Sequence, residues 1–257
     1  MRIHQIRNAT IVLEFQREVL LVDPMLGRQG SLPPFRLLTS ERLRNPLCEL
    51  PSQFEALKAR VTAALISHCQ RGHVDHLDPA GIAFLKERRI PTYVSERDFR
   101  FLQKKGLEVV ALDSALPFFG GEVRLVPARH GRGFVSTFME HGSGFLLRLP
   151  GEPSLYLMGD TVLTPEVEAL ILAEQPDYIV AHCGCAQLDV GQPILMSAAE
   201  ILRLFELSEG VIIANHMDAL DHCTISRADL GRLLREEELE PRAIVLADGE
   251  SRELSPR

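Results

Sequence analysis

Short apolar runs, each bounded by polar or turn-forming residues, recur along the whole chain. Near the N-terminus, residues 10–15 and 19–22 have the composition of short strands, and residues 61–67 (VTAALIS) that of a buried strand. A proline- and arginine-bearing stretch from about 27 to 51 predicts a long loop between them. Further apolar runs predict strands at 122–128, 134–140, 144–150, 154–160, 177–182, 210–216 and 242–247.

Helices are indicated mainly by the residues at which they would begin. Asp78 is an N-cap residue directly before Pro79, and the run AGIAFLKERR follows them. Three other starts have the spacing of a capping box: Ser95 with Asp98, Ser197 with Glu200, and Ser226 with Asp229. Only Glu200 is the preferred acid at that position. The strand-rich block at about 107–160, with helix–strand alternation on both sides, predicts an α/β protein with mixed sheets.

Composition and charge narrow the class of protein. The chain has 257 residues, 46% of them hydrophobic and 25% charged, as in ordinary globular proteins. A net charge of −7 argues against a nucleic-acid or acidic-membrane surface. No apolar run approaches the roughly 18 residues that span a bilayer, and the N-terminus lacks the apolar core of a signal peptide. We therefore expect a cytoplasmic protein that binds neither nucleic acid nor membrane.

The five cysteines follow no disulfide framework. Their number is odd, so thiols or metal ligands are expected rather than disulfides. Cys183 and Cys185 form a C-x-C pair, which is short of a zinc-binding set. They are interpreted as small loop residues, with a soft-metal pair as the alternative.

Several polar residues lie at or just beyond the ends of predicted strands. They are His68, His130, Asp160, His182 and His216. Strands that end together can hold such side chains around one centre, as in many binding sites. His182 is either a structural histidine or a residue that orients a ligand. The sequence shows the strand ends but does not show that they converge.

The segment ISHCQRGHVDHLDP, residues 66–79, concentrates metal-ligand chemistry. His73, Asp75 and His76 offer imidazole and carboxylate groups that suit Zn, Mn or Fe. A polar loop followed by a helix cap is the alternative interpretation of HxDH taken alone. The later motifs RHGRG (129–133), MGDT (158–161) and ANHMD (214–218) each add a ligand type after an apolar run, which favours the metal site.

These motifs, in their order along the chain, resemble those of the metallo-β-lactamase-fold hydrolases. The resemblance is to the branch that includes the ascorbate-6-phosphate lactonases, and it extends over nearly the whole chain. ATIVLEF…VLLVDPML resembles the opening hairpin of that branch, and ISHCQRGHVDHLD resembles its metal loop. PARH, YLMGDT and IIANH resemble its later ligand positions. The resemblance implies one domain over residues 1–257 with a four-layer αβ/βα sandwich.

The resemblance also implies a site for two divalent metal ions, with Zn expected first and Mn or Fe as alternatives. The first ion would take His73 and His130, with His68 if it reaches. The second would take Asp75, His76 and His216, with Asp160 bridging the two. A metal-bound water or hydroxide, with a pKa near 7, would be the nucleophile. Asp75 and Asp160 would then be the catalytic carboxylates.

The metal loop departs from the family pattern, because four residues separate His68 from His73 where the family has one. Without a gap, Arg71 would occupy the first ligand position, and a guanidinium cannot be a ligand. With a three-residue insertion His68 keeps that role, and Gly72 lets the longer loop fold back. The alternatives are a three-ligand first site, or a protein that holds only the second metal firmly. Arg71 would then replace the positive charge of a metal or bind a substrate anion.

The expected partner is a small-molecule substrate, and the sequence leaves open whether the chain forms a homo-oligomer. Arg71, Arg129 and Arg132 would favour an anionic substrate if they point inward, and surface solvation is the alternative for each. We assign substrate binding to Arg71, Arg129 and His222, with a plain loop role as the alternative for His222. The expected substrate is a small anionic ester, lactone or phosphodiester.

Two other classes of function stay open on the sequence. The altered His68–His73 spacing is compatible with a metal-poor protein that acts as a binding or regulatory module. A di-iron oxidoreductase is the third reading, but it would need an electron partner for which the chain has no spare length.

Overall fold

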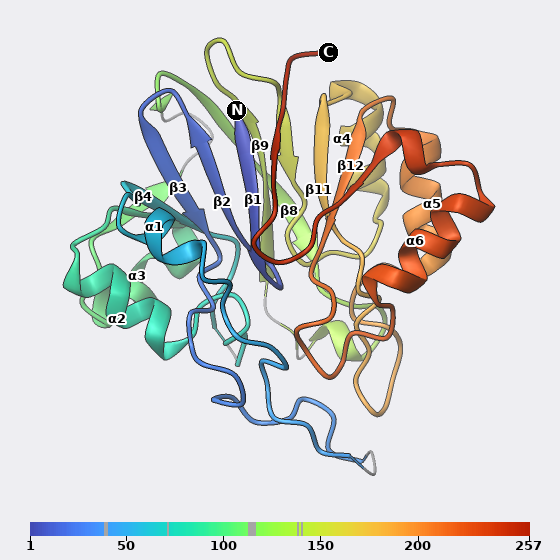
Figure 1. The fold of residues 1–257 in the computed structure, drawn as a ribbon, viewed down its shortest axis with the longest axis horizontal. Coiled ribbons are helices and arrows are strands. Elements are labelled where there is room, and N and C mark those ends of the chain that lie inside the picture. The colour runs from blue at the N-terminus through green and yellow to red at the C-terminus, as the bar shows by residue number, and fades with distance from the viewer. Residues whose placement is uncertain (39–40, 71, 113–116, 138, 140) are drawn as a thin grey trace.

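The computed structural model describes residues 1–257 apart from 39–40, 71, 113–116, 138 and 140, and it contains two β-sheets packed face to face (Figure 1). The first sheet has the order β14-β1-β2-β3-β4-β5-β6 and the second β13-β12-β11-β10-β9-β8-β7. Strands of the first sheet are β1 (Arg2–Arg7), β2 (Thr10–Phe15), β3 (Glu18–Val22), β4 (Ala63–Ile66), β5 (Thr92–Ser95), β6 (Val109–Leu112) and β14 (Ser251–Glu253). Strands of the second are β7 (Pro117–Phe118), β8 (Gly121–Arg129), β9 (His141–Arg148), β10 (Leu155–Leu157), β11 (Tyr178–His182), β12 (Val211–Asn215) and β13 (Ala243–Val245).

Helices form the two outer layers. The first three follow β-strands of the first sheet and lie on its outer side, whereas the last three lie on the outer side of the second sheet (Figure 1). They are α1 (Phe54–Lys58), α2 (Pro79–Glu87), α3 (Glu96–Lys104), α4 (Pro165–Glu174), α5 (Ala198–Leu207) and α6 (Arg227–Glu236), with short 3₁₀ turns η1 (Val135–Thr137) and η2 (Glu240–Arg242). The predicted four-layer αβ/βα sandwich is confirmed.

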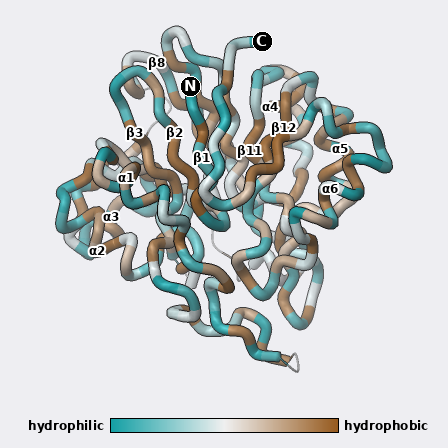
Figure 2. The backbone as a smooth tube through the Cα atoms, in the orientation of Figure 1, coloured by the Kyte–Doolittle hydropathy of each residue, from teal (hydrophilic) through white to brown (hydrophobic). Residues whose placement is uncertain are grey.

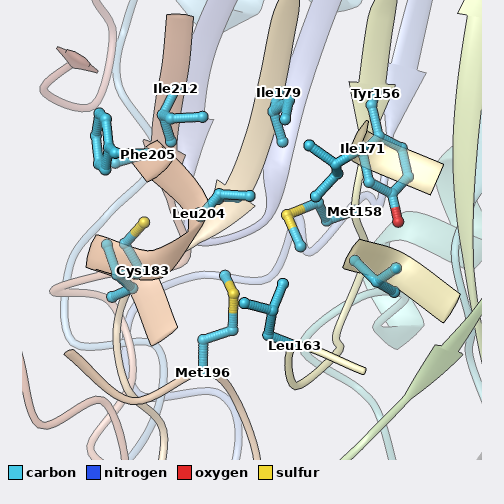
Figure 3. Close-up of a cluster of buried hydrophobic side chains, with 14 of the residues drawn as sticks. Tyr156, Met158, Leu163, Ile171, Ile179, Cys183, Met196, Leu204, Phe205 and Ile212 are labelled. Carbon is cyan, nitrogen blue, oxygen red and sulfur yellow. The ribbon is translucent and has the colours of Figure 1, made fainter. Parts of the chain in front are cut away.

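Three apolar cores hold these layers together. Leu13 and Leu20 from the first sheet pack with Leu147 and Val180 from the second, in the core between the sheets. A second core joins the first sheet to its helices, and a third joins the second sheet to α4, α5 and α6. Figure 3 shows part of the third core, and Figure 2 shows the apolar strands inside the more polar helices and loops. The cores bury apolar surface on both faces of each sheet, which is the dominant favourable term in folding.

Strand direction brings the predicted ligands to one end of the sandwich. β3 and β4 pair in parallel, as do β10, β11 and β12. β8 runs antiparallel to β9, which runs antiparallel to β10, so β8 ends at the same edge as β10. The loops that follow these strands therefore lie together at one end of the sandwich.

Two local predictions are wrong. Residues 134–140 do not form a strand, because 135–137 are a 3₁₀ turn; 138 and 140 lie outside the described residues. Ser136 and Thr137 donate from their hydroxyls to the carbonyls of Gly133 and Phe134, and such local bonds favour a turn. The capping box predicted at Ser95 is absent, because Ser95 makes no capping bond to the α3 backbone.

The other predicted helix starts form as expected. Ser197 with Glu200 and Ser226 with Asp229 each form the complete reciprocal pair of a capping box. Asp78 accepts a hydrogen bond from the Gly81 backbone at the start of α2. Within the described residues, no helix has both the length and the apolar character that a membrane span requires.

Candidate metal centre

Seven of the predicted ligands converge at the open end of the sandwich in two adjacent groups. The first group consists of His68, His73 and His130. The second group consists of Asp75, His76, Asp160 and His216. In each group, one ligand atom from every member lies within 4.8 Å of the others, and all seven side chains are buried. The three-residue insertion has therefore not displaced His68, whose side chain lies with the other two histidines of its group.

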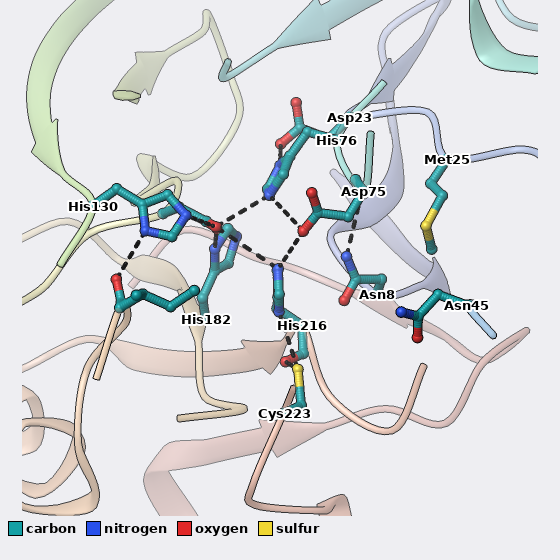
Figure 4. A network of polar contacts seen from close by, with 12 residues as sticks. Asn8, Asp23, Met25, Asn45, Asp75, His76, His130, His182, His216 and Cys223 are labelled. Carbon is teal, nitrogen blue, oxygen red and sulfur yellow. Dashed lines mark hydrogen bonds and ion pairs between the residues drawn. The ribbon is translucent and has the colours of Figure 1, made fainter. Parts of the chain in front are cut away.

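The five histidines of these groups share one orientation. Each turns Nδ1 towards a partner within the protein. Nε2 of His76, His130 and His216 faces the centre (Figure 4), and His68 Nε2 lies 3.9 Å from Asp160 Oδ2. The Nδ1 partners are Ser67 Oγ for His68 (3.0 Å), the Gln70 carbonyl for His73 (2.8 Å), Asp23 Oδ2 for His76 (2.8 Å), the Ile194 carbonyl for His130 (3.0 Å) and Cys223 Sγ for His216 (3.5 Å). Where the partner is a carbonyl or carboxylate, Nδ1 carries the proton and Nε2 presents a lone pair. That is the tautomer a metal ion requires.

Several of the inward-facing nitrogens have no hydrogen-bond partner. Within the part of the chain that the structure describes, this holds for Nε2 of His68, His76 and His216, all of which are fully buried. Two of them face carboxylate oxygens without hydrogen-bond geometry: His76 Nε2 is 3.2 Å from Asp160 Oδ2, and His216 Nε2 is 3.4 Å from Asp75 Oδ2. Buried polar atoms without a hydrogen bond are uncommon, so three together require an explanation. Three converging imidazole lone pairs with neighbouring carboxylates are a suitable donor set for a divalent transition metal. The residues present therefore fit the metal ions that the sequence resemblance implies.

Asp160 lies between the two groups. Its Oδ2 atom is 3.0 Å from Nε2 of His130 in the first group and 3.2 Å from Nε2 of His76 in the second. The same oxygen is 3.8 Å from His216 Nε2 and 3.9 Å from His68 Nε2. One carboxylate oxygen of Asp160 thus lies near imidazoles of both groups, and its role as a shared ligand stays a prediction.

His182 differs from the five other histidines, because it turns Nδ1 towards the centre and contacts Oδ1 of Asp160. The other oxygen of Asp160, Oδ2, therefore faces the imidazoles of the two ligand groups. Of the two roles left open by the sequence, the structure favours orienting a ligand, namely the central carboxylate.

Burial and charge act differently on the two groups. Burial lowers the pKa of His68 well below its usual range, and repulsion from His76 adds to the effect. Burial also opposes a charge on His76, but the nearby carboxylates, led by Asp160, raise its pKa well above the usual range. For Asp160 burial raises the pKa, yet the imidazoles, led by His76, lower it well below normal. The second group therefore combines buried carboxylates with imidazoles and favours a cation, whereas burial keeps His68 of the first group neutral.

The chain is locally adapted to place His216. This residue follows β12 with φ at 57°, a left-handed conformation that is rare outside glycine. Its backbone N–H donates to the Asn8 carbonyl at 3.1 Å, and its carbonyl accepts from Cys223 Sγ. A Cβ atom on Gly184 would lie 2.1 Å from that carbonyl oxygen, so glycine is required there. Backbone strain of this kind is typical of functional sites.

Asp23 is the residue of this site that sequence reasoning missed. It follows β3, and its carboxylate accepts from His76 Nδ1 and from both the backbone and hydroxyl of Ser67. The signal was available, since Asp23 also ends an apolar strand, but its partner is 53 residues away. Asn8 was missed too; its side-chain amide donates to the Asp75 carbonyl.

The residues assigned to substrate binding are less uniform. Arg71 lies outside the described residues. Arg129 is exposed, and no described contact of its side chain leads to the ligand groups, so its role stays a prediction. Arg132 donates to Glu200 and to the Leu163 carbonyl, and neither partner belongs to the ligand groups.

His222 is buried beside the second group. Its ring centroid is 6.0 Å from that of His216 and 5.0 Å from that of Phe35. Burial lowers the pKa of His222 to about 4, so its imidazole is neutral at pH 7. Its Nδ1 atom has no hydrogen-bond partner among the described residues.

The cysteine pair lies outside both ligand groups. Cys183 belongs to the apolar core under α5, and burial raises its pKa far above the usual range. Burial likewise raises the pKa of Cys185 to about 12. Both are thus protonated side chains with apolar surroundings, as the interpretation as small loop residues predicts.

Similarity to known proteins agrees with this geometry. No family model matches the chain. The chain is 32% identical over 255 residues to UPF0173 protein YddR of Bacillus subtilis (strain 168), a match that covers 98% of this chain and 99% of that protein. The chain belongs to the UPF0173 family. It is also 26% identical over 194 residues to a UPF0173 metal-dependent hydrolase of Azorhizobium caulinodans, covering 72% of this chain and 73% of that one.

Solved structures are similar over the whole chain. A possible metal-dependent hydrolase from Veillonella parvula DSM 2008 superposes with a TM-score of 0.90 at 29% identity, covering 99% of both chains. An isothiocyanate hydrolase from Delia radicum gut bacteria also gives 0.90, at 28% identity, covering 99% of this chain and 100% of that one. The metallo-β-lactamase fold protein YhfI of Bacillus subtilis gives 0.66 at 13% identity, covering 98% and 99%, and shows the fold alone.

The chain is therefore a metallo-β-lactamase-fold member of a metal-dependent hydrolase family, as the motifs predicted. The finer resemblance to ascorbate-6-phosphate lactonases stays a prediction, as do the cytoplasmic location and the single-domain boundary.

Proposed function

We propose that this protein is a binuclear metal-dependent hydrolase of small molecules. The observation that carries the proposal is the set of three buried Nε2 atoms, on His68, His76 and His216, that lack hydrogen-bond partners among the described residues. They belong to two ligand groups with a carboxylate between them. Two groups joined in this way suit a pair of metal ions better than a single ion.

The first ion would be held by His68, His73 and His130, and the second by Asp75, His76 and His216, with Asp160 between them. Imidazole and carboxylate ligands suit zinc first, with manganese and iron as alternatives. Such ions lower the pKa of bound water to about 7 and so supply a hydroxide nucleophile at neutral pH.

The protein's own groups prepare this centre. Asp23 and Cys223 fix the rings of His76 and His216, and His182 fixes the carboxylate of Asp160. Buried, neutral His222 would contact the bound substrate through its unpartnered Nδ1. Because it can donate or accept a hydrogen bond, this imidazole would orient the reacting group without adding charge.

Two substrate classes are consistent with the surroundings. A small anionic ester, lactone or phosphodiester would need positive charge from Arg71 or Arg129. An isothiocyanate would instead need an apolar wall. Phe35 and Val74 pack against the apolar cluster of Met25, Leu32 and Leu220, and the Phe35 ring contacts His222. The likeness to an isothiocyanate hydrolase over the full chain favours testing this class as well.

Metal analysis and a substrate panel test the proposal together. Metal content per chain is measured by mass spectrometry for protein purified without chelator, for chelator-treated protein, and after reconstitution with Zn, Mn or Fe. We expect about two ions per chain, and fewer in His68→Ala. Turnover is then measured with benzyl isothiocyanate, followed as amine release, and with bis-p-nitrophenyl phosphate and a phosphorylated sugar lactone. Near-zero metal after reconstitution, with no turnover, would overturn the hydrolase and leave a binding or regulatory module.

A further inference from the structure

Cys69 and Gln70, two of the four residues between His68 and His73, contact helix α3. The Gln70 side-chain amide donates to Asp98 Oδ1 at 2.8 Å and to the Arg97 carbonyl at 3.2 Å. Cys69 Sγ lies 3.6 Å from the same Asp98 oxygen, within reach of a thiol donor. The inserted part of the metal loop therefore leaves the end of β4 and contacts the first turn of the neighbouring helix.

Asp98 is unusual for a carboxylate in the first turn of a helix, because it is fully buried. Ser95 Oγ donates to its second oxygen at 3.1 Å, and this hydroxyl makes no capping bond to the helix backbone. A buried carboxylate is costly unless it is well hydrogen-bonded. One oxygen of Asp98 thus accepts a hydrogen bond from the metal loop and the other accepts one from Ser95, in place of the ordinary capping arrangement.

The fastened loop sets the direction of His73. The Gln70 carbonyl accepts a hydrogen bond from the His73 backbone N–H at 3.0 Å and another from His73 Nδ1 at 2.8 Å. The chain returns through Gly72, whose φ of +92° suits glycine. Holding Gln70 in place therefore fixes both the tautomer of His73 and the position of its ring.

We propose that Asp98 is a positioning residue for the first ligand group, acting through Gln70 on His73. This inference rests on the proposed metal-binding function. The second group has different orienting partners, Asp23 for His76 and Cys223 for His216. Loss of the Asp98 contact should therefore weaken one metal site and spare the other.

The test is a zinc and cobalt titration of the chelator-treated full-length protein. Removing a residue that orients a metal ligand typically costs about 10- to 100-fold in metal affinity. For Asp98→Ala we expect a loss of this size at the first site, with the second site unchanged within about twofold. Asp98→Asn keeps an acceptor oxygen for the Gln70 amide and should fall between the wild type and the alanine variant. The cobalt spectrum gives a readout that does not depend on activity.

Gln70→Ala separates positioning from folding, because it removes the amide but keeps the backbone carbonyl that accepts from His73. It should reproduce the selective loss even if Asp98→Ala folds poorly. In a double-mutant cycle with Asp98→Ala, the combined loss should be smaller than the sum of the single losses, since both changes remove the same Gln70–Asp98 contact. Asp177→Asn is the matched control; this carboxylate accepts from Ser154 before β11, at the opposite end of the strands from the centre.

The outcomes separate the two proposals. Selective loss of the first metal in Asp98→Ala and Gln70→Ala, with Asp177→Asn unchanged, supports positioning. Two ions with unchanged affinities in both test variants overturn the positioning role and leave the hydrolase proposal intact. Equal loss from both sites also overturns it, since it indicates a general structural defect. A wild-type protein that binds no metal overturns both proposals.

Discussion

The two ligand groups lie side by side but are built on different principles. The first has three imidazoles and no carboxylate, and two of these imidazoles are oriented by backbone carbonyls, those of Gln70 and Ile194. The second has two carboxylates, and its histidines are oriented by side chains, Asp23 and Cys223. The positions of the ligands in the first group therefore depend on the backbone of the loops. Those in the second group depend on charged and polar side chains. We expect the second site to hold its cation more tightly.

The largest effect should come from the residue that the groups share. Asp160→Asn keeps the shape of the side chain but removes the charge that lies within 4 Å of four imidazole Nε2 atoms. Both metals should be lost, and hydrolysis should fall by roughly 100-fold or more, the upper end of the effect of ligand-orienting residues. Metal content and kcat/KM for the active substrate measure this. Retention of both ions would show that Asp160 is not shared.

Single-ligand variants should separate the two sites. His73→Ala should remove the first ion and leave the second, because none of the second group's orienting contacts passes through His73. In His216→Ala the second group loses a donor, and the second ion should leave. Stoichiometry after dialysis against a weak chelator distinguishes the two results. Loss of both ions from His73→Ala would mean that the second site is not independent.

A smaller effect is expected when a side chain that orients a ligand is changed. Asp23→Asn preserves the size of the residue but weakens the hydrogen bond that His76 donates from Nδ1. Affinity at the second site should fall by about 10- to 100-fold, with little change at the first. Zinc titration with a competing dye measures both constants. An equal loss at both sites would contradict the separation of the groups.

The smallest effect concerns the metal-free protein. Burial lowers the pKa of His222 to about 4 from its usual 6.5, so the unfolded chain binds more protons than the folded one between these values. Stability is then lost as the pH falls through this window, by roughly 1 kcal/mol at pH 5.5. Urea denaturation at pH 8 and 5.5 should show a smaller loss for His222→Asn than for the wild type. Equal losses of stability in the two proteins would show that a group other than His222 causes the pH dependence.

Local pattern determined much of the fold. The apolar runs marked most strands of the second sheet, and the caps at Asp78, Ser197 and Ser226 marked three helices, because both signals arise within a few residues. The run at 134–140 failed for the complementary reason: strand-like composition does not exclude a turn where side-chain hydroxyls bond the nearby backbone. The sequence pattern did not predict strand β1 or helix α1.

The sequence by itself determined the kinds of ligand and their places at strand ends, because residue type and strand position are local properties. Only the tertiary structure decided that His68 reaches its group, that Asp23 orients His76, and that Asp98 receives the inserted loop. These are contacts between side chains on different elements, and hydrophobic periodicity carries no information about them. The spacing of four residues in the metal loop raised the question of His68, and the position of its ring beside His73 and His130 answers it.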